Sequence, residues 1–478
     1  MIPWLLHKPA FGVQIEALRR SEGRRGFLFL MEQGLGKTGV ALNEFAYLHS
    51  IGKADLMIVI SPNSPRSNWQ DEAKDMGFPY PVDLWPMTDK PKVIVINYEA
   101  LTLGNLGGKG VTVGKGGRFL LNLVQHNKAY LFFDECHRLK NPSSNVTKFV
   151  LAHLVKDAAY VRGGTGTPYG KSVMDLYPQL RMVGALNGVN PYSFRSKYAV
   201  LAGFQGKTVV GIKKESQQDL YDLIDEHSFR ALKCEWTDIP DKLYKSTRVE
   251  MPPALVPYYR SMKQVFLVTL DDINGGTEIG ANAVITQMGK LQQISSGFII
   301  DEDRVCQDLV PVFDLPKYKA ILDTLDANGT GSKTIVFVHH THSLARLVAA
   351  FEKDTGHAPA VIKGGLSPEE TREQKALFNR DGPPYVIVAQ IQAAKEGHTL
   401  LGGPATPCYT EVFFETTYNM IDRSQCEDRP HRHGQKHNVL ICDFPSSPIE
   451  VTAISAIQRK KDVATEILDA RRNKTVVL

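Results

Sequence analysis

Residues 422–435 read D-R-S-Q-C-E-D-R-P-H-R-H-G-Q, and two stretches far upstream give this one its meaning. A glycine-rich stretch, G-L-G-K-T, occupies residues 34–38, and a paired-acid stretch, D-E-C-H, occupies residues 134–137. In the last stretch Arg429 and Arg432 are three residues apart, so we expect them on one face of a helix. In this order, the three stretches predict a two-lobed motor, with a triphosphate held by one lobe and arginines supplied by the other.

Length and composition set the broad class. A chain of 478 residues suits two or three domains, and 43% hydrophobic with 22% charged residues is typical of a folded, water-soluble protein. The net charge of +5 permits a nucleic-acid partner without requiring one. The six cysteines are scattered without a C-x-x-C pair, which disfavours a zinc module and favours a reducing compartment. We find neither a signal peptide nor an apolar run of the ~20 residues that a membrane span needs, so we expect a cytoplasmic protein.

The order of apolar runs predicts two α/β units. Short β-rich runs alternate with helical stretches in the first part, which indicates a parallel sheet. Helical patterns dominate residues 173–300, and the tail 449–477 is helical and charged. A glycine-rich segment at 104–118 is expected to be an inserted loop or hairpin. The expected strands are 26–31, 56–60, 93–96, 130–133 and 160–162, and, in the second unit, 334–338, 361–362, 385–388, 412–414 and 439–442.

The glycine-rich stretch has the chemistry of a phosphate-binding loop. A strand followed by such a loop and a helix presents backbone N–H groups to a phosphate at the helix N-terminus. Lys37 is expected to reach the β- and γ-phosphates, and the Thr38 hydroxyl to join the magnesium shell. Met31 stands where the strict P-loop pattern requires its first glycine. The residues that we expect to bind ATP here are Gly34, Leu35, Gly36, Lys37 and Thr38.

The paired acids have the chemistry of hydrolysis. Both are expected at the tip of a buried strand, where Asp134 can hold magnesium and Glu135 can orient and deprotonate the attacking water. Carboxylates at a strand end also serve as helix caps, so the pair alone would carry little weight. Its position about a hundred residues after the phosphate loop favours the catalytic interpretation.

Taken together, the motifs resemble those of the Swi/Snf-type DNA-dependent ATPases of helicase superfamily two, from Lys8 to Lys461. That family reads D-E-x-H-R-x-K-N after its acid pair, which residues 134–141 match, and [ST]-G-T-P, which residues 165–168 match. Its last motif is Q-x-x-D-R-x-H-R-x-G-Q, matched here by Gln425, Asp428, Arg429, His431, Arg432, Gly434 and Gln435.

The resemblance implies a fold and a set of nucleotide-handling residues. It implies an α/β fold of two RecA-like parallel-sheet lobes with helical protrusions between and on them, divided here as 1–245 and 246–478. It implies ATP and magnesium at the cleft between the lobes. By position, Gln14 would read adenine, although a surface glutamine on a helix is the alternative. The catalytic residues would be Lys37, Asp134, Glu135, Arg429 and Arg432; Gln425 would bind ATP; Thr38 and Asp134 would hold the metal; and His137, Thr165, Gly166 and Thr167 would couple hydrolysis to the second lobe.

The resemblance also places residues on DNA. Loops after strands of both lobes contact the sugar-phosphate backbone in this family, which implies contacts by Ser64, Arg66, Asn97, Lys363, Gly364 and Thr399. Such contacts position DNA without reading bases. Trp69 is expected to pack in the core. Residues 397–400 read G-H-T-L, a variant found in the fork-remodelling branch of the family, and Arg230, Lys233, Pro240 and Lys242 resemble its link between lobes.

The implied function is ATP-driven translocation along double-stranded or forked DNA, independent of sequence and without strand separation. We expect a monomeric, minimal motor core from a bacterium, an archaeon or a virus, in which last case the location is the host cytoplasm. One alternative is a strand-separating helicase or the motor subunit of a restriction or repair system. Another is an ATP-gated DNA clamp with low turnover, which the presence of Lys37, Glu135 and Arg432 disfavours.

Overall fold

The computed structural model describes residues 1–63, 66–86, 91–102, 113–169, 172–202, 208–264, 279–301, 303–395 and 399–469. These residues form two compact units. The first is Met1–Asp238 together with residues from Val463 onward, and the second is Ile239–Asp462. The division expected at 245/246 falls inside strand β10 (Lys242–Ser246), which pairs in parallel with a strand of the second unit.

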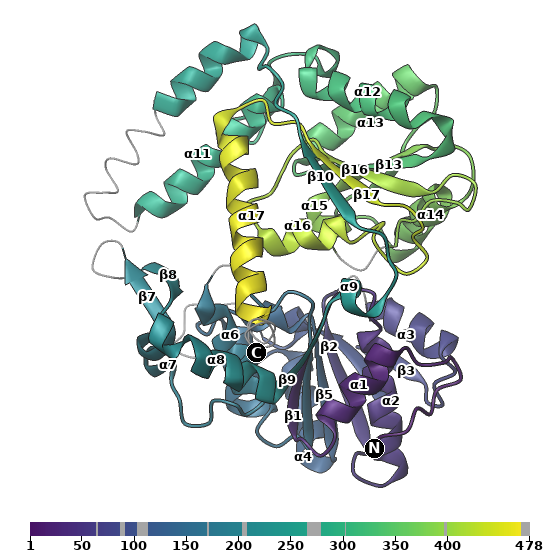
Figure 1. Cartoon of the computed structure of the whole chain (residues 1–478), viewed down its shortest axis with the longest axis vertical. Helices are drawn as coiled ribbons and strands as arrows, with labels where there is room; N and C mark the ends of the chain where they lie inside the picture. The colour runs from purple at the N-terminus through teal and green to yellow at the C-terminus, as the bar shows by residue number, and fades with distance from the viewer. Residues whose placement is uncertain are drawn as a thin grey trace, which may run out of the picture. The chain divides into compact units, whose positions relative to one another are not determined.

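A parallel sheet forms the centre of the first unit (Figure 1). Its seven described strands lie in the order β3-β4-β2-β5-β6-β1-β9, and every neighbouring pair is parallel. Because β1, β6 and β5 are neighbours, the loops that follow them meet at one edge of the sheet. The strands are β1 (Gly26–Met31), β2 (Leu56–Ser61), β3 (Val82–Leu84), β4 (Val93–Asn97), β5 (Ala129–Asp134), β6 (Tyr160–Gly164) and β9 (Ser228–Ala231).

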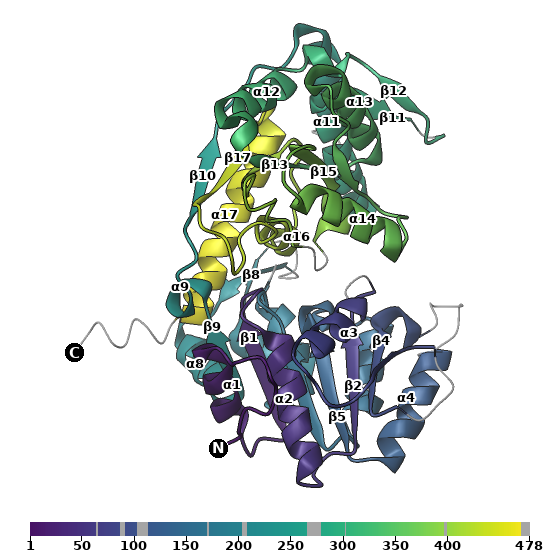
Figure 2. The same cartoon turned by 90° about the vertical axis from the view of Figure 1, so that its right-hand side faces the viewer.

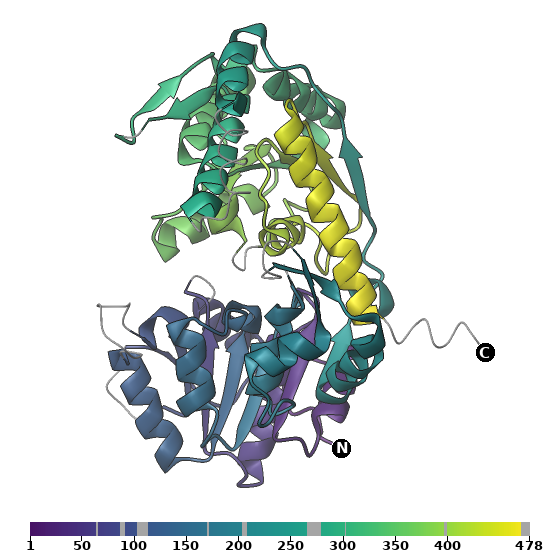
Figure 3. The same ribbon diagram turned by 90° about the vertical axis from the view of Figure 1, so that its left-hand side faces the viewer.

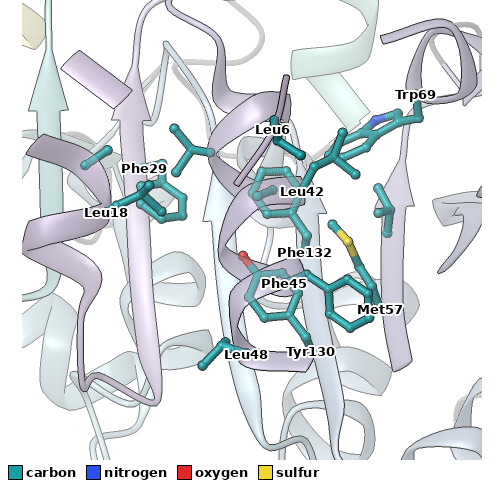
Figure 4. Close-up of a cluster of buried hydrophobic side chains, with 14 of the residues drawn as sticks. Leu6, Leu18, Phe29, Leu42, Phe45, Leu48, Met57, Trp69, Tyr130 and Phe132 are labelled. Carbon is teal, nitrogen blue, oxygen red and sulfur yellow. The ribbon is translucent and has the colours of Figure 1, made fainter. Parts of the chain in front are cut away.

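Helices cover both faces of this sheet. On one face, α1 (Gly12–Ser21), α2 (Lys37–Ser50) and α3 (Arg66–Asp75) pack on an apolar cluster that includes Phe29, Phe45, Tyr130 and Phe132 (Figure 4). Contacts on the other face involve α4 (Lys115–His126), η2 (Cys136–Leu139) and α6 (Leu176–Met182). Alternate residues of the strands serve the two faces, which explains their nearly continuous apolar sequences. The remaining elements are η1 (Tyr98–Ala100), α5 (Asn145–Phe149), η3 (Val150–Leu154), η4 (Val173–Asp175), α7 (Pro191–Tyr198), the antiparallel pair β7 (Ala199–Ala202) and β8 (Thr208–Ile212), α8 (Lys214–His227) and α9 (Lys233–Trp236).

A buried polar cluster ties α2, the helix that begins at Lys37, to the sheet. Glu44 on α2 is 1% exposed and accepts hydrogen bonds from the Arg162 guanidinium, at 2.8 and 2.9 Å, and from the Tyr130 hydroxyl at 2.8 Å. Arg162 also donates to the backbone carbonyls of Arg24 and Arg25. Because both charges are paired and hydrogen-bonded, this cluster can be buried beneath the site.

The second unit repeats the parallel architecture (Figures 2 and 3). Its six described strands lie in the order β10-β17-β16-β13-β15-β14, all parallel. Helices α11, α12 and α13 pack on one face, and α14, α15 and α16 on the other. The elements that follow β10 are η6 (Pro253–Leu255), α11 (Ile279–Ser295), the antiparallel pair β11 (Phe298–Ile300) and β12 (Cys306–Asp308), η7 (Val312–Asp314), α12 (Pro316–Asn328), η8 (Gly329–Gly331), β13 (Lys333–Val338), α13 (Thr341–Thr355), β14 (Ala360–Ile362), α14 (Pro368–Asn379), β15 (Val386–Gln390), α15 (Ile391–Ala394), β16 (Cys408–Phe413), α16 (Met420–Glu427), β17 (Val439–Asp443) and α17 (Pro448–Asp469).

The predicted fold class, two parallel-sheet α/β units with helical additions, is confirmed. Each strand expected from an apolar run is present within a residue or two, except that β16 begins four residues before the expected 412. The expected loop at 104–118 is wrong at its end, because helix α4 begins at Lys115; residues 103–112 lie outside the described part of the chain. No helix among the described residues has both the length and the apolar character to cross a membrane.

Candidate functional site

The phosphate loop connects β1 to α2 as predicted. Gly36 precedes the first residue of α2 and has a φ of 78°, a left-handed conformation that favours glycine. The Lys37 ammonium donates to the Met31 carbonyl at 2.9 Å and lies 3.3 Å from that of Glu32, so it folds back over the loop. Leu35 is 1% exposed and packs in the core, which leaves its backbone as the part able to meet a phosphate.

Gln14 lies directly against this loop rather than on the surface. Its side chain is 2% exposed; its amide oxygen accepts from the Phe11 N–H at 2.8 Å, and its amide nitrogen donates to the Gly36 carbonyl at 3.1 Å. A β-carbon at Gly36 would lie 2.2 Å from that nitrogen, so a side chain larger than hydrogen would displace it. Gln14 therefore links α1 to the phosphate loop, and its recognition of adenine stays a prediction.

Asp134, at the end of β5, is held by groups from three other segments. The Ser61 hydroxyl and the Trp69 indole N–H donate to its Oδ2 at 3.1 and 3.2 Å, and the Tyr98 hydroxyl donates to its backbone carbonyl at 2.8 Å. Burial, followed by the neighbouring Glu135 charge, raises the pKa of Asp134 to about 6. A bound cation would offset both effects, which suits the expected metal ligand.

Glu135 has a φ of 49°, which is rare for a residue other than glycine. Its Oε2 accepts from the Thr165 hydroxyl at 3.2 Å and lies 3.2 Å from His137 Nδ1, which in turn lies 2.9 Å from the Thr165 oxygen. Burial opposes ionisation of Glu135, but the His137 hydrogen bond and charge, the Lys37 charge and the Thr165 hydrogen bond outweigh it and lower its pKa. Glu135 is therefore ionised at neutral pH.

The T-G-T-P stretch at 165–168, called the threonine box below, follows β6 and lies close to the phosphate loop. A β-carbon at Gly166 would lie 3.1 Å from Glu32 Cα and 3.2 Å from the Met31 carbonyl oxygen. The Thr167 N–H donates to the Thr165 hydroxyl at 3.1 Å. Within the described part of the chain, the buried Thr167 hydroxyl has no hydrogen-bond partner. The predicted coupling residues His137, Thr165, Gly166 and Thr167 thus surround Glu135 and the loop.

The donors available for a metal ion are hard oxygens. Thr38 lies in the first turn of α2, and Asp134 ends β5. A hydroxyl and a carboxylate, with substrate phosphates and water, are the kind of ligands that Mg²⁺ prefers. Among the described residues no group of three or more histidine, cysteine and acidic side chains could enclose a metal by itself. The residues present therefore fit a magnesium ion shared with a nucleotide.

Two of the three expected DNA contacts of the first unit, Arg66 and Asn97, lie at the end of a helix or strand. Ser64 lies outside the described residues. Arg66 begins α3 and donates to the Trp85 carbonyl at 3.0 Å. Asn97 ends β4, and its side-chain amide donates to Glu99 at 3.2 Å.

In the second unit, residues 422–435, which carry Arg429 and Arg432 and are called the arginine segment below, differ from their expected conformation. Helix α16 ends at Glu427, so Arg429 and Arg432 lie beyond it, and the prediction that they share a helical face is wrong. Pro430 explains the difference, because a residue before proline disfavours the helical conformation and proline has no N–H to donate. Arg429 is fully buried and donates from Nε to the Gln425 carbonyl at 2.6 Å. Arg432 is partly exposed and donates from Nε to the Asp428 carbonyl at 3.1 Å.

The other predicted residues of this unit lie on a helix and between elements. Arg432 Nη1 donates to the Thr399 hydroxyl at 3.2 Å, so this expected DNA contact touches the arginine segment. Gln425 lies on α16 and is 6% exposed. Lys363 is exposed after β14, and the Gly364 N–H donates to the Gln390 side chain at 3.1 Å. Residues 396–398 lie outside the described part, so the G-H-T-L variant stays an untested hint.

Sequence reasoning missed several supporting residues. Trp69 is buried as expected, but its indole N–H also bonds Asp134, a role that only the order of β2, β4 and β5 in the sheet reveals. Lys233, noted only as part of a link between lobes, lies at the phosphate loop: its N–H donates to Glu32 at 2.6 Å, and its Cε would lie 3.8 Å from a β-carbon at Gly34. The signal was present in the R-x-x-K spacing, but its location required the pairing of β9 with β1.

The first unit has a phosphate loop, an acid pair and a threonine box at the ends of three neighbouring parallel strands, and a second parallel-sheet unit follows. This arrangement is typical of P-loop ATPases of the helicase type. A family model described as type III restriction enzyme, res subunit, matches residues 9–169. The chromodomain-helicase-DNA-binding protein 3 homolog of Caenorhabditis elegans is 22% identical over 470 residues, covering 91% of this chain and 25% of that protein. The transcription regulatory protein SNF2 of Saccharomyces cerevisiae is 23% identical over 474 residues, covering 92% of this chain and 26% of that protein.

Among solved structures, the SWI2/SNF2 ATPase core of Sulfolobus solfataricus in complex with dsDNA covers 98% of this chain and 95% of its own, with 19% identity and a TM-score of 0.42. The chain is similar to the Caenorhabditis elegans and Saccharomyces cerevisiae proteins along more than nine-tenths of its own length. It spans about a quarter of the length of the two curated relatives described above.

Proposed function

We propose that this chain is an ATP-dependent DNA translocase of the Swi/Snf type. The observation that carries the proposal is the grouping in the first unit of Lys37, Asp134, Glu135 and Thr165 at the ends of three neighbouring strands. Each residue has the chemistry that its role requires, and the second unit adds two arginines in the family's last motif.

ATP binding follows from the loop. The triphosphate accepts hydrogen bonds from the backbone N–H groups at the start of α2, and Lys37 neutralises its β- and γ-phosphates. Thr38 and Asp134 would hold magnesium. When bound, that ion neutralises negative charge on the phosphate oxygens. Gln14 would accept the adenine, and Gln425 would contribute from the second unit.

In hydrolysis, Glu135 is the proposed proton acceptor. The oxygen of a water molecule forms a bond to the γ-phosphorus while the bond from that phosphorus to the bridging oxygen breaks, which yields ADP and phosphate. Glu135 orients this water and accepts its proton. Arg432 neutralises the developing charge, as arginine fingers do in such ATPases, and its supply by the second unit to a triphosphate held by the first stays a prediction of the resemblance. Thr165 and His137 contact Glu135, which supports the proposed role of these residues in coupling hydrolysis to the second lobe.

DNA is the proposed track. Relatives whose names include DNA binding and transcription regulation support it. Arg66 begins α3 and Asn97 ends β4 in the first unit, and Lys363, Gly364 and Thr399 lie between elements in the second. They have groups suited to phosphates, so binding independent of sequence is expected. A monomer in the cytoplasm, or in the host cytoplasm for a viral chain, stays a prediction.

An ATPase assay tests this function. Turnover should be measured without nucleic acid and with single-stranded, duplex and forked DNA, on the full chain and on its Glu135→Gln variant. We expect duplex DNA to stimulate turnover most, and the variant to show no stimulated rate. If no form of DNA raises the turnover, the chain is not a DNA-dependent motor.

One alternative has an observation in its favour. The match of residues 9–169 to the res subunit of type III restriction enzymes is compatible with a strand-separating helicase, or with the motor subunit of a restriction or repair system. Unwinding of a plain duplex distinguishes the two functions, since a Swi/Snf-type translocase leaves the strands paired. An ATP-gated DNA clamp predicts binding with low turnover in the same assay.

A further inference from the structure

The residues that follow the division between the two units are bonded to the arginine segment. The Lys242 ammonium donates to Asp428 Oδ1 at 2.9 Å, and His431 Nε2 lies 2.7 Å from the Pro240 carbonyl oxygen. The Asp241 N–H donates to the Asn438 side chain at 3.1 Å. Strand β10 then pairs with β17 from Lys242 onward. The P-x-K part of the link motif thus lies against the family's last motif within the second unit.

Asp428 connects Lys242 to Arg432. Its carboxylate accepts from Lys242, and its backbone carbonyl accepts from Arg432 Nε at 3.1 Å. It directly follows the C-terminal end of α16, where the helix dipole disfavours a negative charge and favours a nearby cation. Burial would lower the pKa of Lys242, but Asp428 and Glu427 raise it, so the ammonium remains charged. The ion pair therefore stabilises the backbone from which Arg432 extends.

We propose that Lys242 is a positioning residue that, through Asp428, holds Arg432 in its catalytic orientation. The inference rests on the proposed function, in which Arg432 acts on the γ-phosphate. Lys242 touches no reacting atom. It fixes Asp428, whose carbonyl accepts a hydrogen bond from the Arg432 guanidinium, which also donates to Thr399. The second unit begins at Ile239, close before Lys242. The ion pair of Lys242 with Asp428 therefore also joins the start of this unit to the arginine segment.

The test compares turnover and nucleotide affinity of the full-length chain. Lys242→Met should lower kcat with saturating duplex DNA by about 10- to 100-fold, the loss typical of a misplaced catalytic group. Binding of a fluorescent ATP analogue should change by no more than about twofold, since a group acting only in the transition state does not alter ground-state binding. Lys242→Arg, which keeps the charge, should restore most of the rate. Lys245→Met, at an exposed position of the same strand, is the matched control and should behave as the wild type.

A double variant decides whether Lys242 acts through Arg432. If it does, Lys242→Met should slow the Arg432→Ala variant little further, because contributions through one group are not additive. An unchanged kcat in Lys242→Met, or the same fold loss in both backgrounds, would overturn the inference. Full activity of Arg432→Ala itself would instead remove the proposed role of the arginine. Should Lys242→Met fail to fold, as judged by thermal unfolding, Asp428→Asn takes its place: it keeps the shape, weakens the same pair, and should show the same loss of kcat.

Discussion

Two adjacent carboxyl groups, Asp134 and Glu135, occupy different environments, and this difference assigns their roles. Burial and the neighbouring charge raise the pKa of Asp134, whereas His137, Lys37 and Thr165 outweigh burial and lower that of Glu135. When two neighbouring acids are driven apart in this way, each is suited to a different task. A bound cation would offset the effects that raise the pKa of Asp134, whereas the hydrogen bond from Thr165 already favours the charged form of Glu135.

Replacing Glu135 should separate binding from hydrolysis. Glu135→Gln keeps the shape of the side chain but removes the proton acceptor, so turnover should fall at least ~100-fold while ATP still binds. Lys37→Ala should instead weaken the binding of the triphosphate. Equilibrium binding of labelled ATP and steady-state phosphate release measure the two effects. Glu226→Gln, on the exposed side of α8, is the control. A Glu135→Gln protein with the wild-type rate would show that another group accepts the proton.

The two arginines should differ in their effects. Arg432→Ala should slow turnover by ~1000-fold or more with little change in ATP affinity, because the proposed role of Arg432 is in the transition state. Since Arg432 is partly exposed, its loss should change the thermal stability little. Arg429 is fully buried, so Arg429→Ala should lower the thermal stability of the chain as well as the rate. Phosphate release and thermal unfolding of both variants check this. Equal loss of stability in the two would contradict the distinction.

At the residue scale, the sequence predicts which residues form the motifs better than it predicts their hydrogen-bond partners and backbone conformation. Lys37, Asp134 and Thr165 follow buried strands, so their meeting at one sheet edge could be predicted from spacing. The bonds of Trp69 and Ser61 to Asp134 could not, because they depend on which strands are neighbours. The left-handed backbone of Glu135 likewise has no sequence signal.

At the element scale, apolar runs predict the central strands and the edge strand β14, but not the edge strands β3, β9 and β10. β2, β4 and β5 are buried on both faces, so their sequences are continuously apolar. β9 and β10 are edge strands with polar residues such as Arg230, Lys242 and Lys245, and neither was predicted. The helix expected through Arg432 ends at Glu427 instead, because Pro430 disfavours the helical conformation in the residue before it.

Strand β16 contains a buried acid with consequences for stability. Glu411 is fully buried, and neither of its carboxyl oxygens has a hydrogen-bond partner among the residues that the structure describes. Burial, and then the Glu427 charge, raise its pKa well above the usual value. The folded chain therefore holds this proton at pH values where the unfolded chain has lost it. Its contribution to stability is complete below the unfolded pKa and is lost as the pH rises toward the raised one.

Glu411→Gln should remove this dependence. Relative to the wild type, the variant should gain stability between pH 5 and pH 8, by up to about 1.4 kcal/mol per pH unit for one proton. Amide hydrogen exchange of β16 and β17 at several pH values reports the local stability. Glu352→Gln, on the exposed face of α13, should show no such trend. A gain that is constant with pH would mean that Glu411 is ionised in the folded chain.

At the scale of the whole molecule, the motifs divide between two units of the same architecture. The phosphate loop, acid pair and threonine box lie in the first, and the arginine segment lies in the second. This division could be predicted because two series of apolar runs flank a helical stretch. The place of the division could not, because a polar edge strand, β10, follows it directly.

DNA binding by the whole molecule should be electrostatic. The expected contacts are residues suited to phosphates, so affinity should not depend on sequence and should fall with salt. A protein that neutralises only two phosphates loses about tenfold in affinity when the salt concentration rises from 50 to 200 mM. Fluorescence anisotropy of two unrelated duplexes over this range measures both properties. A salt-insensitive affinity, or strong preference for one duplex, would indicate base recognition instead.

Movement along duplex DNA gives the most direct test of the motor. A translocase that tracks one strand within a duplex should displace the third strand of a triplex, with ATP, and leave the underlying duplex paired. Lys37→Ala should abolish displacement, because that side chain is expected to hold the triphosphate. Release of a labelled third strand, followed beside a labelled plain duplex, distinguishes the outcomes. Efficient separation of the plain duplex would favour the helicase alternative. Activity only on forked DNA would favour the remodelling branch to which the sequence at 397–400 points.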